Sequence, residues 1–238
     1  MSTYFQLLQQ AVTNRGPSPL VTWINDIGRI ELSAVTFSNA VCKASNFLID
    51  GLELEEDSSI SVDLGNHWQS PVWLGTGLAT GIKVTDQSGA IMFGTLAAAQ
   101  VWKRSADEFV IVSQDPFGMP DKEIPSLFVN GSAEVRNFGD YFSPSWSLDP
   151  DEIVVKVSHK ELNWEQLVVH ALELADKNGI KPEQNYGLQG KGDLLTQIAL
   201  QVVLPIVNQN SIVLIDQTEP DFDAITKQEK LSQIVRLA

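Results

Sequence analysis

The chain has 238 residues, and its hydrophobic share of 43% is ordinary for a globular protein with an internal core. Thirty aspartates and glutamates against sixteen lysines and arginines give a formal net charge of -14, which would repel nucleic acid and anionic lipid surfaces. We therefore expect neither nucleic acid nor a membrane as a partner, and no apolar run approaches the length of about eighteen residues that a membrane span requires.

The amino-terminal segment is predicted to contain a helix followed by a hairpin. Residues 1–15 lack an early cationic segment and an uninterrupted apolar core, so they indicate an amphipathic helix rather than a secretory signal, and a cytoplasmic protein. Residues 20–33 alternate around Asp26-Ile27-Gly28, a pattern typical of a β-hairpin whose turn uses the backbone freedom of Asp and Gly. Ser33 can then cap a helix that stops at Gly51.

Cys42 is the only cysteine of the chain. A single cysteine excludes an internal disulfide and any metal site that needs several cysteines. Because Cys42 falls within the apolar-periodic stretch of the predicted helix, we expect it to be a buried small hydrophobe, with a reactive thiol as the alternative.

The middle of the chain predicts strands that alternate with helices. The expected elements are a strand at 59–64, a helix from about 66 to 79 that Gly81 ends, a short strand at 82–85, an apolar segment at 91–93, a helix at 96–102 and a strand at 109–113. This alternation is typical of βαβ units. We therefore predict an α/β fold with largely parallel sheets flanked by helices.

Regular patterning is lost between residues 116 and 150. Five prolines punctuate this stretch, which predicts a long surface excursion with one short helix or strand. The stretch is also a candidate junction, so we divide the chain into a first α/β segment at 1–115, an irregular connection at 116–150 and a second α/β segment at 151–238. The three parts are expected to form one compact unit.

The last third of the chain returns to regular patterns. Residues 153–157 predict a buried strand, and Ser158-His159-Lys160-Glu161 fits a capping box that opens a long helix ending at Asn178-Gly179. The remaining predicted elements are an apolar-faced helix at 194–206, a strand at 211–215 and a final amphipathic helix at 222–237.

Taken in order, these blocks resemble the first half of the large domain of adenylate-forming enzymes, the acyl-CoA synthetase-like family. Asp26-Ile27-Gly28 and Leu32-Ser33-Ala34-Val35-Thr36-Phe37 resemble the family's early hairpin and the start of its first helix. The segments 57–79, 158–162 and 203–214 resemble three later blocks of the family. The likeness covers most of the chain and extends to short actinobacterial relatives of AMP-binding enzymes, whose role is unknown.

The chain departs from this family where the family binds ATP. The family's phosphate loop is rich in Gly, Ser and Thr and ends in Pro-Lys-Gly, and its lysine position falls on Ile153. The loop itself falls on residues 145–152, which offer no glycine and three carboxylates, Asp149, Asp151 and Glu152. A carboxylate a few ångströms from phosphate oxygens is unfavourable by an amount on the order of kilocalories. We therefore expect no triphosphate binding.

Other parts of the family's machinery are also not matched. The chain has no Tyr-Gly-x-Thr-Glu motif, and the family's ribose-binding aspartate, hinge and lid domain with its catalytic lysine fall beyond the matched region. No Gly-x-Ser-x-Gly elbow is found, so nucleophilic catalysis has no candidate residue. We therefore assign no catalytic residue and no cofactor.

Several chemistry-bearing residues favour structural interpretations. Gly75-Thr76-Gly77, followed by Gly81, falls late in a predicted helix rather than directly after a strand, which favours close helix packing and a helix stop over a dinucleotide site. His159 and His170 would lie three helical turns apart, too far to share one metal, and His67 is the only other histidine.

Two features of the irregular stretch leave alternatives open. The carboxylates of Asp149, Asp151 and Glu152 could hold a hard cation or simply form a solvated loop before the next strand. Trp146 is expected either in the core or as an exposed anchor for a partner. We assign no metal-binding residue.

Three functional hypotheses follow from these observations. The leading one is a non-catalytic remnant of the adenylate-forming fold that binds another protein or itself, most simply as a two-fold dimer through the predicted helices at 194–207 and 222–237. The alternative is a small-molecule module that keeps a pocket for an acyl, aryl or nucleoside group at the carboxyl ends of the strands. An enzyme of unrelated chemistry is the third.

Overall fold

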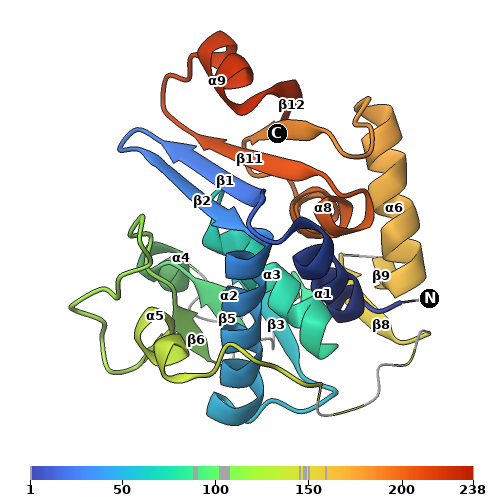
Figure 1. The fold of residues 1–238 in the computed structure, drawn as a ribbon. Helices are drawn as coiled ribbons and strands as arrows, with labels where there is room; N and C mark the ends of the chain where they lie inside the picture. The colour runs from blue at the N-terminus through green and yellow to red at the C-terminus, as the bar shows by residue number, and fades with distance from the viewer. Residues whose placement is uncertain are drawn as a thin grey trace.

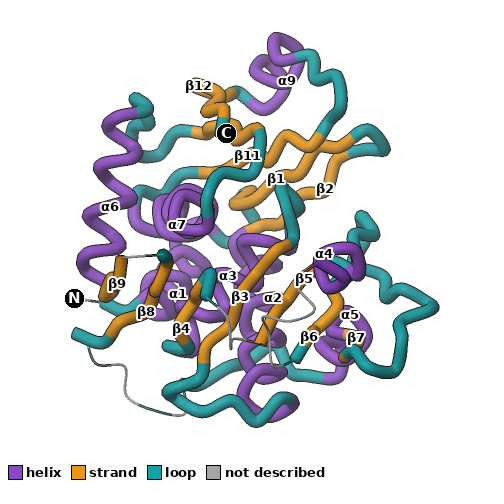
Figure 2. Tube along the Cα trace, turned by 180° about the vertical axis from the view of Figure 1, so that it is seen from behind, coloured by secondary structure: helices purple, strands orange, loops and turns teal. Residues whose placement is uncertain are grey.

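The computed structural model describes residues 2–87, 91–101, 108–144, 146, 149, 151–158 and 160–237. Its strands form two sheets, and helices lie between the sheets and on their outer faces, as Figure 1 and Figure 2 show from opposite sides. No helix in these described ranges has both the length and the apolar character needed to cross a membrane.

The first sheet has five strands in the order β12-β10-β11-β1-β2. Their bounds are β12 Leu231–Arg236, β10 Asn185–Gln189, β11 Ser211–Asp216, β1 Pro19–Asn25 and β2 Arg29–Ser33. Strand β11 runs parallel to both β1 and β10, β10 runs parallel to β12, and β2 is antiparallel to β1. The carboxyl ends of β10, β11 and β12 therefore meet at one edge of the sheet.

The second sheet has seven strands in the order β7-β6-β5-β3-β4-β8-β9. Their bounds are β7 Val129–Asn130, β6 Phe109–Ile111, β5 Ile91–Gly94, β3 Ser59–Asp63, β4 Lys83–Thr85, β8 Ile153–Val157 and β9 Lys160–Asn163. All neighbours are parallel except β8 and β9. The predicted α/β fold with largely parallel sheets is confirmed.

The helices cover both sheets and supply much of the core. Their bounds are α1 Tyr4–Arg15, α2 Ala34–Asn46, α3 Gln69–Thr80, α4 Leu96–Val101, α5 Gly131–Glu134, α6 Trp164–Lys177, α7 Leu194–Gln197, α8 Leu204–Val207 and α9 Phe222–Glu229. A π-helical turn at Phe47–Gly51 continues α2, another at Ile198–Val203 joins α7 to α8, and a 3-10 turn at Val135–Asn137 follows α5. Every residue of α3 is buried, because this helix packs on β3 and β4 and is covered by α2.

Most of the local sequence signals have the predicted structural effect. The amide groups of Ile27 and Gly28 donate to the Asn25 side chain in the β1–β2 turn, and the Ser33 hydroxyl accepts from the Thr36 amide at the start of α2. Gly81 has a φ of 80° and ends α3, a conformation that glycine adopts without a steric penalty. These contacts confirm the hairpin, the helix cap and the helix stop. The predicted cause of the turn is wrong, because neither Asp26 nor Gly28 has a positive φ and the Asn25 side chain holds the turn instead.

Each sheet contains strands from more than one of the predicted segments 1–115, 116–150 and 151–238. The first sheet takes β1 and β2 from 1–115 and three strands from 151–238, and the second takes strands from all three segments. The stretch 116–150 contributes β7, which pairs with β6, followed by α5. The expected short helix or strand in this excursion is therefore present, and the division into segments at 116 and 150 does not follow the sheets.

The predicted capping box at Ser158 is wrong. Ser158 has a φ of 46° and lies at the turn between β8 and the antiparallel β9, where its amide donates to Asp86 Oδ1 at 2.8 Å. The long helix starts at Trp164 instead, with a capping box formed by Asn163 and Gln166. The reason is that Lys160–Asn163 forms β9, which pairs with β8, so these residues cannot form the first turn of a helix. His159 lies outside the described residues.

The predicted final helix over 222–237 is also wrong in its second half. Helix α9 ends at Glu229, Lys230 takes a left-handed conformation with a φ of 53°, and β12 follows as an edge strand beside β10. The apolar residues of 222–237 belong to two different patterns. The pattern through Ile225 is helical, and the pattern through Leu231 and Val235 is that of a strand. The helix on which the dimer prediction partly depended is absent, and self-association remains a prediction.

Candidate functional site

A cleft lies at the carboxyl ends of β10, β11 and β12. Its volume is about 550 Å³, and it is lined by Asn66, Gln189, Gly190, Lys191, Ile215, Asp216, Gln217, Arg236 and Leu237. In parallel α/β sheets, ligands bind outside the carboxyl ends of the strands, because the connecting loops there diverge and leave room. The cleft therefore occupies the position where this architecture is expected to place a ligand.

Asn66 connects the two sheets at the wall of this cleft. It follows β3 of the second sheet, and its Nδ2 donates to the carbonyl oxygens of Leu188 at 3.3 Å and Ile215 at 2.8 Å in the first sheet. The residue is 7% exposed, and its Oδ1 has no hydrogen-bond partner among the described residues. A buried amide oxygen without a donor is unfavourable, so the connection that Asn66 makes between the sheets includes one unfavourable contribution.

Charged side chains of both signs surround the cleft. Lys191 forms an ion pair with Asp63, which joins the loop after β10 to the end of β3. Arg236 lies over the Phe222 ring, with its guanidinium carbon 4.7 Å from the ring centroid. Burial raises the pKa of the Asp216 carboxyl, the Trp23 side chain opposes this rise and the charge of Asp26 adds to it. The lining is therefore polar and carries both donors and acceptors.

The backbone at the rim of the cleft requires glycine at one position. Gly190 has a φ of 85°, and a Cβ atom there would collide with the carbonyl oxygen of Leu237. The Leu237 amide in turn donates to the Gln189 carbonyl at 2.7 Å. This close approach fixes the end of β12 against the loop that follows β10.

His67 lies directly after Asn66 and is only 1% exposed. Its Nδ1 accepts a hydrogen bond from the Gln69 amide at 3.2 Å, and its ring packs edge-on against Trp23 with 4.4 Å between the centroids. Burial lowers the pKa of His67 to about 4, although the charge of Asp115 acts in the opposite direction. The imidazole is therefore neutral at neutral pH and accepts a hydrogen bond from a backbone amide at the start of α3.

The shifted pKa of His67 makes stability depend on pH. The unfolded chain binds a proton at this residue below about pH 6.5, whereas the folded chain binds it only below about pH 4. The stabilisation is therefore complete above pH 6.5, and about 3 kcal/mol is lost as the pH falls from 6.5 to 4. Urea unfolding of the wild type and His67→Asn over this range measures the effect, because Asn keeps an acceptor for the Gln69 amide. Equal pH slopes in the two proteins would contradict it.

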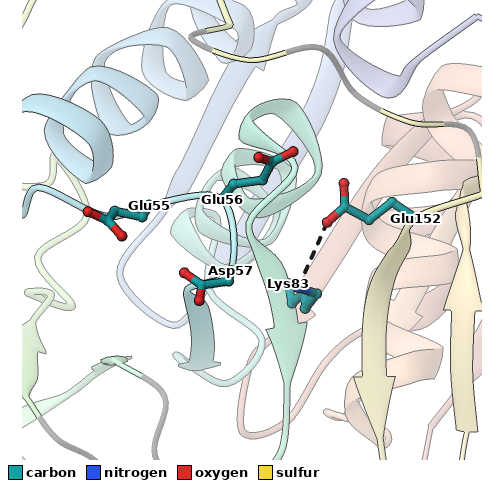
Figure 3. Close-up of a pocket in the computed structure, with 5 residues that line it drawn as sticks. All are labelled: Glu55, Glu56, Asp57, Lys83 and Glu152. Atoms are coloured by element: carbon teal, nitrogen blue, oxygen red, sulfur yellow. Dashed lines mark ion pairs between the residues drawn. The ribbon is translucent and has the colours of Figure 1, made fainter.

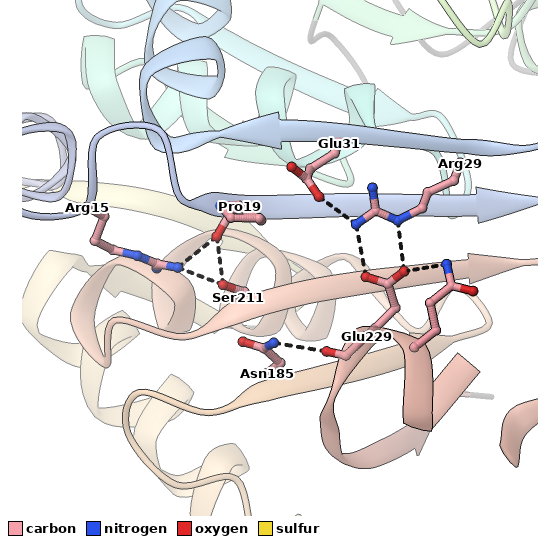
Figure 4. A network of polar contacts seen from close by, with 8 residues as sticks. Arg15, Pro19, Arg29, Glu31, Asn185, Ser211 and Glu229 are labelled. Carbon is pink, nitrogen blue, oxygen red and sulfur yellow. Dashed lines mark hydrogen bonds and ion pairs between the residues drawn. The ribbon is translucent and has the colours of Figure 1, made fainter. Parts of the chain in front are cut away.

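Polar contacts at both ends of the first sheet connect its elements. Figure 4 shows Arg15 contacting the Pro19 carbonyl and the Ser211 hydroxyl, at 2.8 and 2.6 Å. Arg29 on β2 donates to both carboxylate oxygens of Glu229 at the end of α9, at 2.8 and 3.0 Å. These contacts connect β1, β2, β11 and α9, and so they hold together the sheet that carries the cleft.

A second hollow, of about 530 Å³, lies at the amino ends of β3, β4 and β8. Figure 3 shows its lining, in which four carboxylates, those of Glu55, Glu56, Asp57 and Glu152, surround Lys83. Lys83 pairs with Glu152 at 3.8 Å. Among the described residues, no group of three or more His, Cys, Asp or Glu side chains is arranged to hold a metal ion. This hollow has acidic walls and lies at the wrong end of the strands for the expected ligand position.

The residues of the predicted phosphate loop are only partly described. Positions 145, 147, 148 and 150 lie outside the described residues. Asp149 Oδ1 accepts from the Asp151 amide at 2.9 Å, and Glu152 belongs to the acidic hollow. Ile153 begins β8 and is half-buried. The three carboxylates are therefore not brought together at one site, and Trp146 packs partly buried against the core.

The remaining candidates take the structural roles predicted for them. A Cβ at Gly75 would meet the Tyr4 hydroxyl at 2.7 Å and one at Gly77 would meet Val84, which confirms close packing rather than a dinucleotide site. Cys42 is buried, and burial raises the pKa of its thiol, as expected for a small core residue. The cleft was predicted only as a position at the strand ends. No local signal distinguishes its wall residue Asn66 from the polar residues around it, such as His67 and Gln69.

Comparison with known proteins shows what this chain resembles. No family model matches the sequence. A Mycobacterium tuberculosis protein described as "TIGR03089 family protein" is 32% identical over 142 residues, which are 56% of this chain and 58% of that protein. The aligned part is too short to assign this chain to the same family.

Solved structures establish the fold. An acyl-CoA synthetase from Brucella canis matches 99% of this chain and 47% of its own, with a TM-score of 0.79 and 8% identity. The acetoacetyl-CoA synthetase of Streptomyces lividans matches with a TM-score of 0.75 and 13% identity, over 98% of this chain and 42% of its own. A Mycobacterium tuberculosis fatty acyl CoA synthetase matches with a TM-score of 0.72 and 9% identity, over 96% of this chain and 48% of its own. The chain thus has the acyl-CoA synthetase fold over about half the length of these proteins, and the resemblance drawn from the sequence is confirmed.

Proposed function

We propose that this chain is a binding protein on the acyl-CoA synthetase fold, and that its carboxyl-end cleft takes a polar small molecule without adenylating it. The observation that carries the proposal is the cleft of about 550 Å³ at the carboxyl ends of β10, β11 and β12, whose lining brings amide and charged side chains together. A concave site with a few convergent polar groups is the usual form of a small-molecule site.

The residues at the positions that match the family's phosphate loop do not suit adenylation. The residue at the family's phosphate-binding lysine is Ile153, half-buried in β8, and it cannot bind phosphate. The segment before it carries Asp149, Asp151 and Glu152 in place of glycines whose amides could contact phosphate oxygens.

The polar lining selects among the ligand classes that the resemblance suggests. Acyl and aryl groups need mainly apolar walls, and the lining of this cleft is mixed, with Ile215 and Leu237 beside amide and charged side chains. A nucleoside combines an apolar ring face with ring nitrogens, amino groups and hydroxyls, and these match a lining that has both apolar surface and the side-chain amides of Gln189 and Gln217. A nucleoside without a triphosphate is therefore the favoured ligand class.

A thermal shift titration tests this function. Adenosine, guanosine, cytidine and uridine are compared with MgATP, octanoate and benzoate, and at least one nucleoside is expected to raise the melting temperature with a saturable dose response. Lys191→Ala removes a cleft cation and should weaken that response about tenfold, or about 1.4 kcal/mol. Lys83→Ala, which removes the ion-paired lysine of the acidic hollow, is the matched control and should leave it unchanged.

Three results would contradict the proposal. They are a response to MgATP that exceeds the response to every nucleoside, the absence of any nucleoside response, and equal effects of the two lysine variants.

Binding to another protein or to itself is a second candidate function. It no longer rests on a terminal helix, since β12 occupies that part of the chain. It is favoured instead by Phe117, Met119 and Leu127, three large apolar side chains that one loop exposes to solvent.

A further inference from the structure

The loop between β6 and β7, residues 113–128, exposes large apolar side chains. Phe117 is 77% exposed, Met119 is 51% exposed and Leu127 is 75% exposed. Figure 1 shows this loop in green on the outside of the molecule, between β6 and α5. Single exposed apolar residues are ordinary on protein surfaces, but several on one loop are typical of a contact surface for another protein.

Hydrogen bonds within the loop hold its turn in one conformation. Asp115 Oδ1 accepts from the amides of Phe117 at 2.8 Å and Met119 at 3.1 Å, and the Asp115 carbonyl accepts from the Gly118 amide at 2.9 Å. The Ser113 hydroxyl donates to Asp121 Oδ1 at 3.0 Å. Hydrogen bonds of Ser113 and Asp115 therefore stabilise the turn that exposes Phe117 and Met119.

Side chains from the body of the protein fix the same loop from outside. Trp68 Nε1 donates to the Pro116 carbonyl at 3.0 Å, and the buried Gln69 donates to the Ser113 carbonyl at 2.7 Å. Arg136 donates to the Gly118 carbonyl at 2.9 Å. These contacts hold the backbone that carries Phe117 and Met119, so little backbone conformational entropy remains to be lost when a partner binds.

The charges of the loop indicate what kind of partner fits. Residues 113–128 contain three carboxylates, Asp115, Asp121 and Glu123, and one cation, Lys122. The whole chain carries a formal charge of -14, so a second copy would bring like charge to like charge. A surface with positive charge beside an apolar face would complement both the carboxylates and the exposed side chains.

From this geometry we propose that the loop 113–128 is a docking surface for a protein partner that presents an apolar face flanked by basic side chains. This inference rests on the second candidate function above and does not depend on the small-molecule cleft. The anchors are Phe117, Met119 and Leu127, and the loop carboxylates steer the basic partner toward them.

A designed peptide pair tests the proposal on the full-length chain. One fluorescent peptide is an amphipathic helix of leucine and lysine, and the other has glutamate in place of each lysine. The leucine–lysine peptide is expected to bind saturably at roughly physiological salt in a fluorescence anisotropy titration, and the leucine–glutamate peptide is not. The double variant Phe117→Ser with Leu127→Ser should weaken binding by about tenfold or more, since buried aromatic anchors dominate such contacts.

The control is Ile27→Ser with Val101→Ser, which removes two apolar side chains that are each 82% exposed at other places. Binding by this control should equal that of the wild type, and circular dichroism should show that both double variants fold. No binding of the leucine–lysine peptide, equal binding of both peptides, or equal loss in the two double variants would overturn the proposal. A dimer in sedimentation velocity that only the loop variant abolishes would also overturn it, by assigning the loop to a second copy.

Discussion

Replacing Asn66 by alanine is expected to lower the free energy of unfolding by roughly 2–4 kcal/mol. The Asn66 amide donates to the carbonyl oxygens of Leu188 and Ile215, and it is the side chain that connects β3 of one sheet to β10 and β11 of the other. Alanine would remove both donors from a site that is 93% buried, where the loss of a partner exposes each carbonyl to the desolvation penalty. Chemical unfolding monitored by tryptophan fluorescence measures the change.

Asn46 provides a matched control within the same chain. Its Nδ2 also donates to two carbonyl oxygens, those of Gly139 at 2.9 Å and Tyr141 at 2.8 Å, but at a site open to solvent. Water can replace the lost donors there, so Asn46→Ala is expected to lower the free energy of unfolding by less than about 1 kcal/mol. Equal losses of unfolding free energy in the two variants would show that burial does not strengthen the Asn66 contacts. That result would contradict the role of Asn66 in connecting the two sheets.

The elements that the sequence predicts correctly are those whose signals are local. The Asp26-Ile27-Gly28 turn and the Ser33 cap are contacts between residues at most a few positions apart, so their residue types determine them. The same holds for Gly81, since its left-handed conformation ends α3 wherever the helix lies. The order of these local elements was enough to indicate the α/β class and the resemblance.

The elements that the sequence does not reveal depend on distant partners. Strand β10 has the residues Asn185-Tyr186-Gly187-Leu188-Gln189, which are neither alternating nor strongly apolar, and it exists because β11 and β12 pair with it on both sides. The same pairing draws residues 231–236 out of the predicted terminal helix. Such long-range pairing overrides weak local preference.

The candidate site is hidden for the same reason. The cleft gathers Asn66, Lys191, Asp216 and Arg236, which are separated by up to 170 residues in sequence and share no motif. Only the rule that ligands bind at the carboxyl ends of parallel strands gave its position in advance. The identity of its residues requires the strand order, which the sequence pattern alone does not supply.

Replacing Gly77 by alanine is expected to destabilise the protein by about 1–3 kcal/mol, although alanine forms helices better than glycine by about 1 kcal/mol. The new Cβ would lie 2.5 Å from Val84 Cγ2 and 3.2 Å from both Ile60 Cδ1 and the Ile82 carbonyl oxygen. The last of these is backbone, so α3 itself must move away from the second sheet. Gly28→Ala is the control with no atom within 4 Å, and its effect should stay within about 0.5 kcal/mol.

A double-mutant cycle locates the cause of the loss at Gly77. Val84→Ala alone opens a small cavity under α3 and destabilises the protein by itself, because Val84 is fully buried. In the double variant the alanine at 77 fills part of that space, so the two losses should sum to at least about 0.5 kcal/mol more than the measured total. Strict additivity would show that contact with Val84 is not the reason why position 77 requires glycine. The reason would then be the close approach of α3 to the Ile82 backbone.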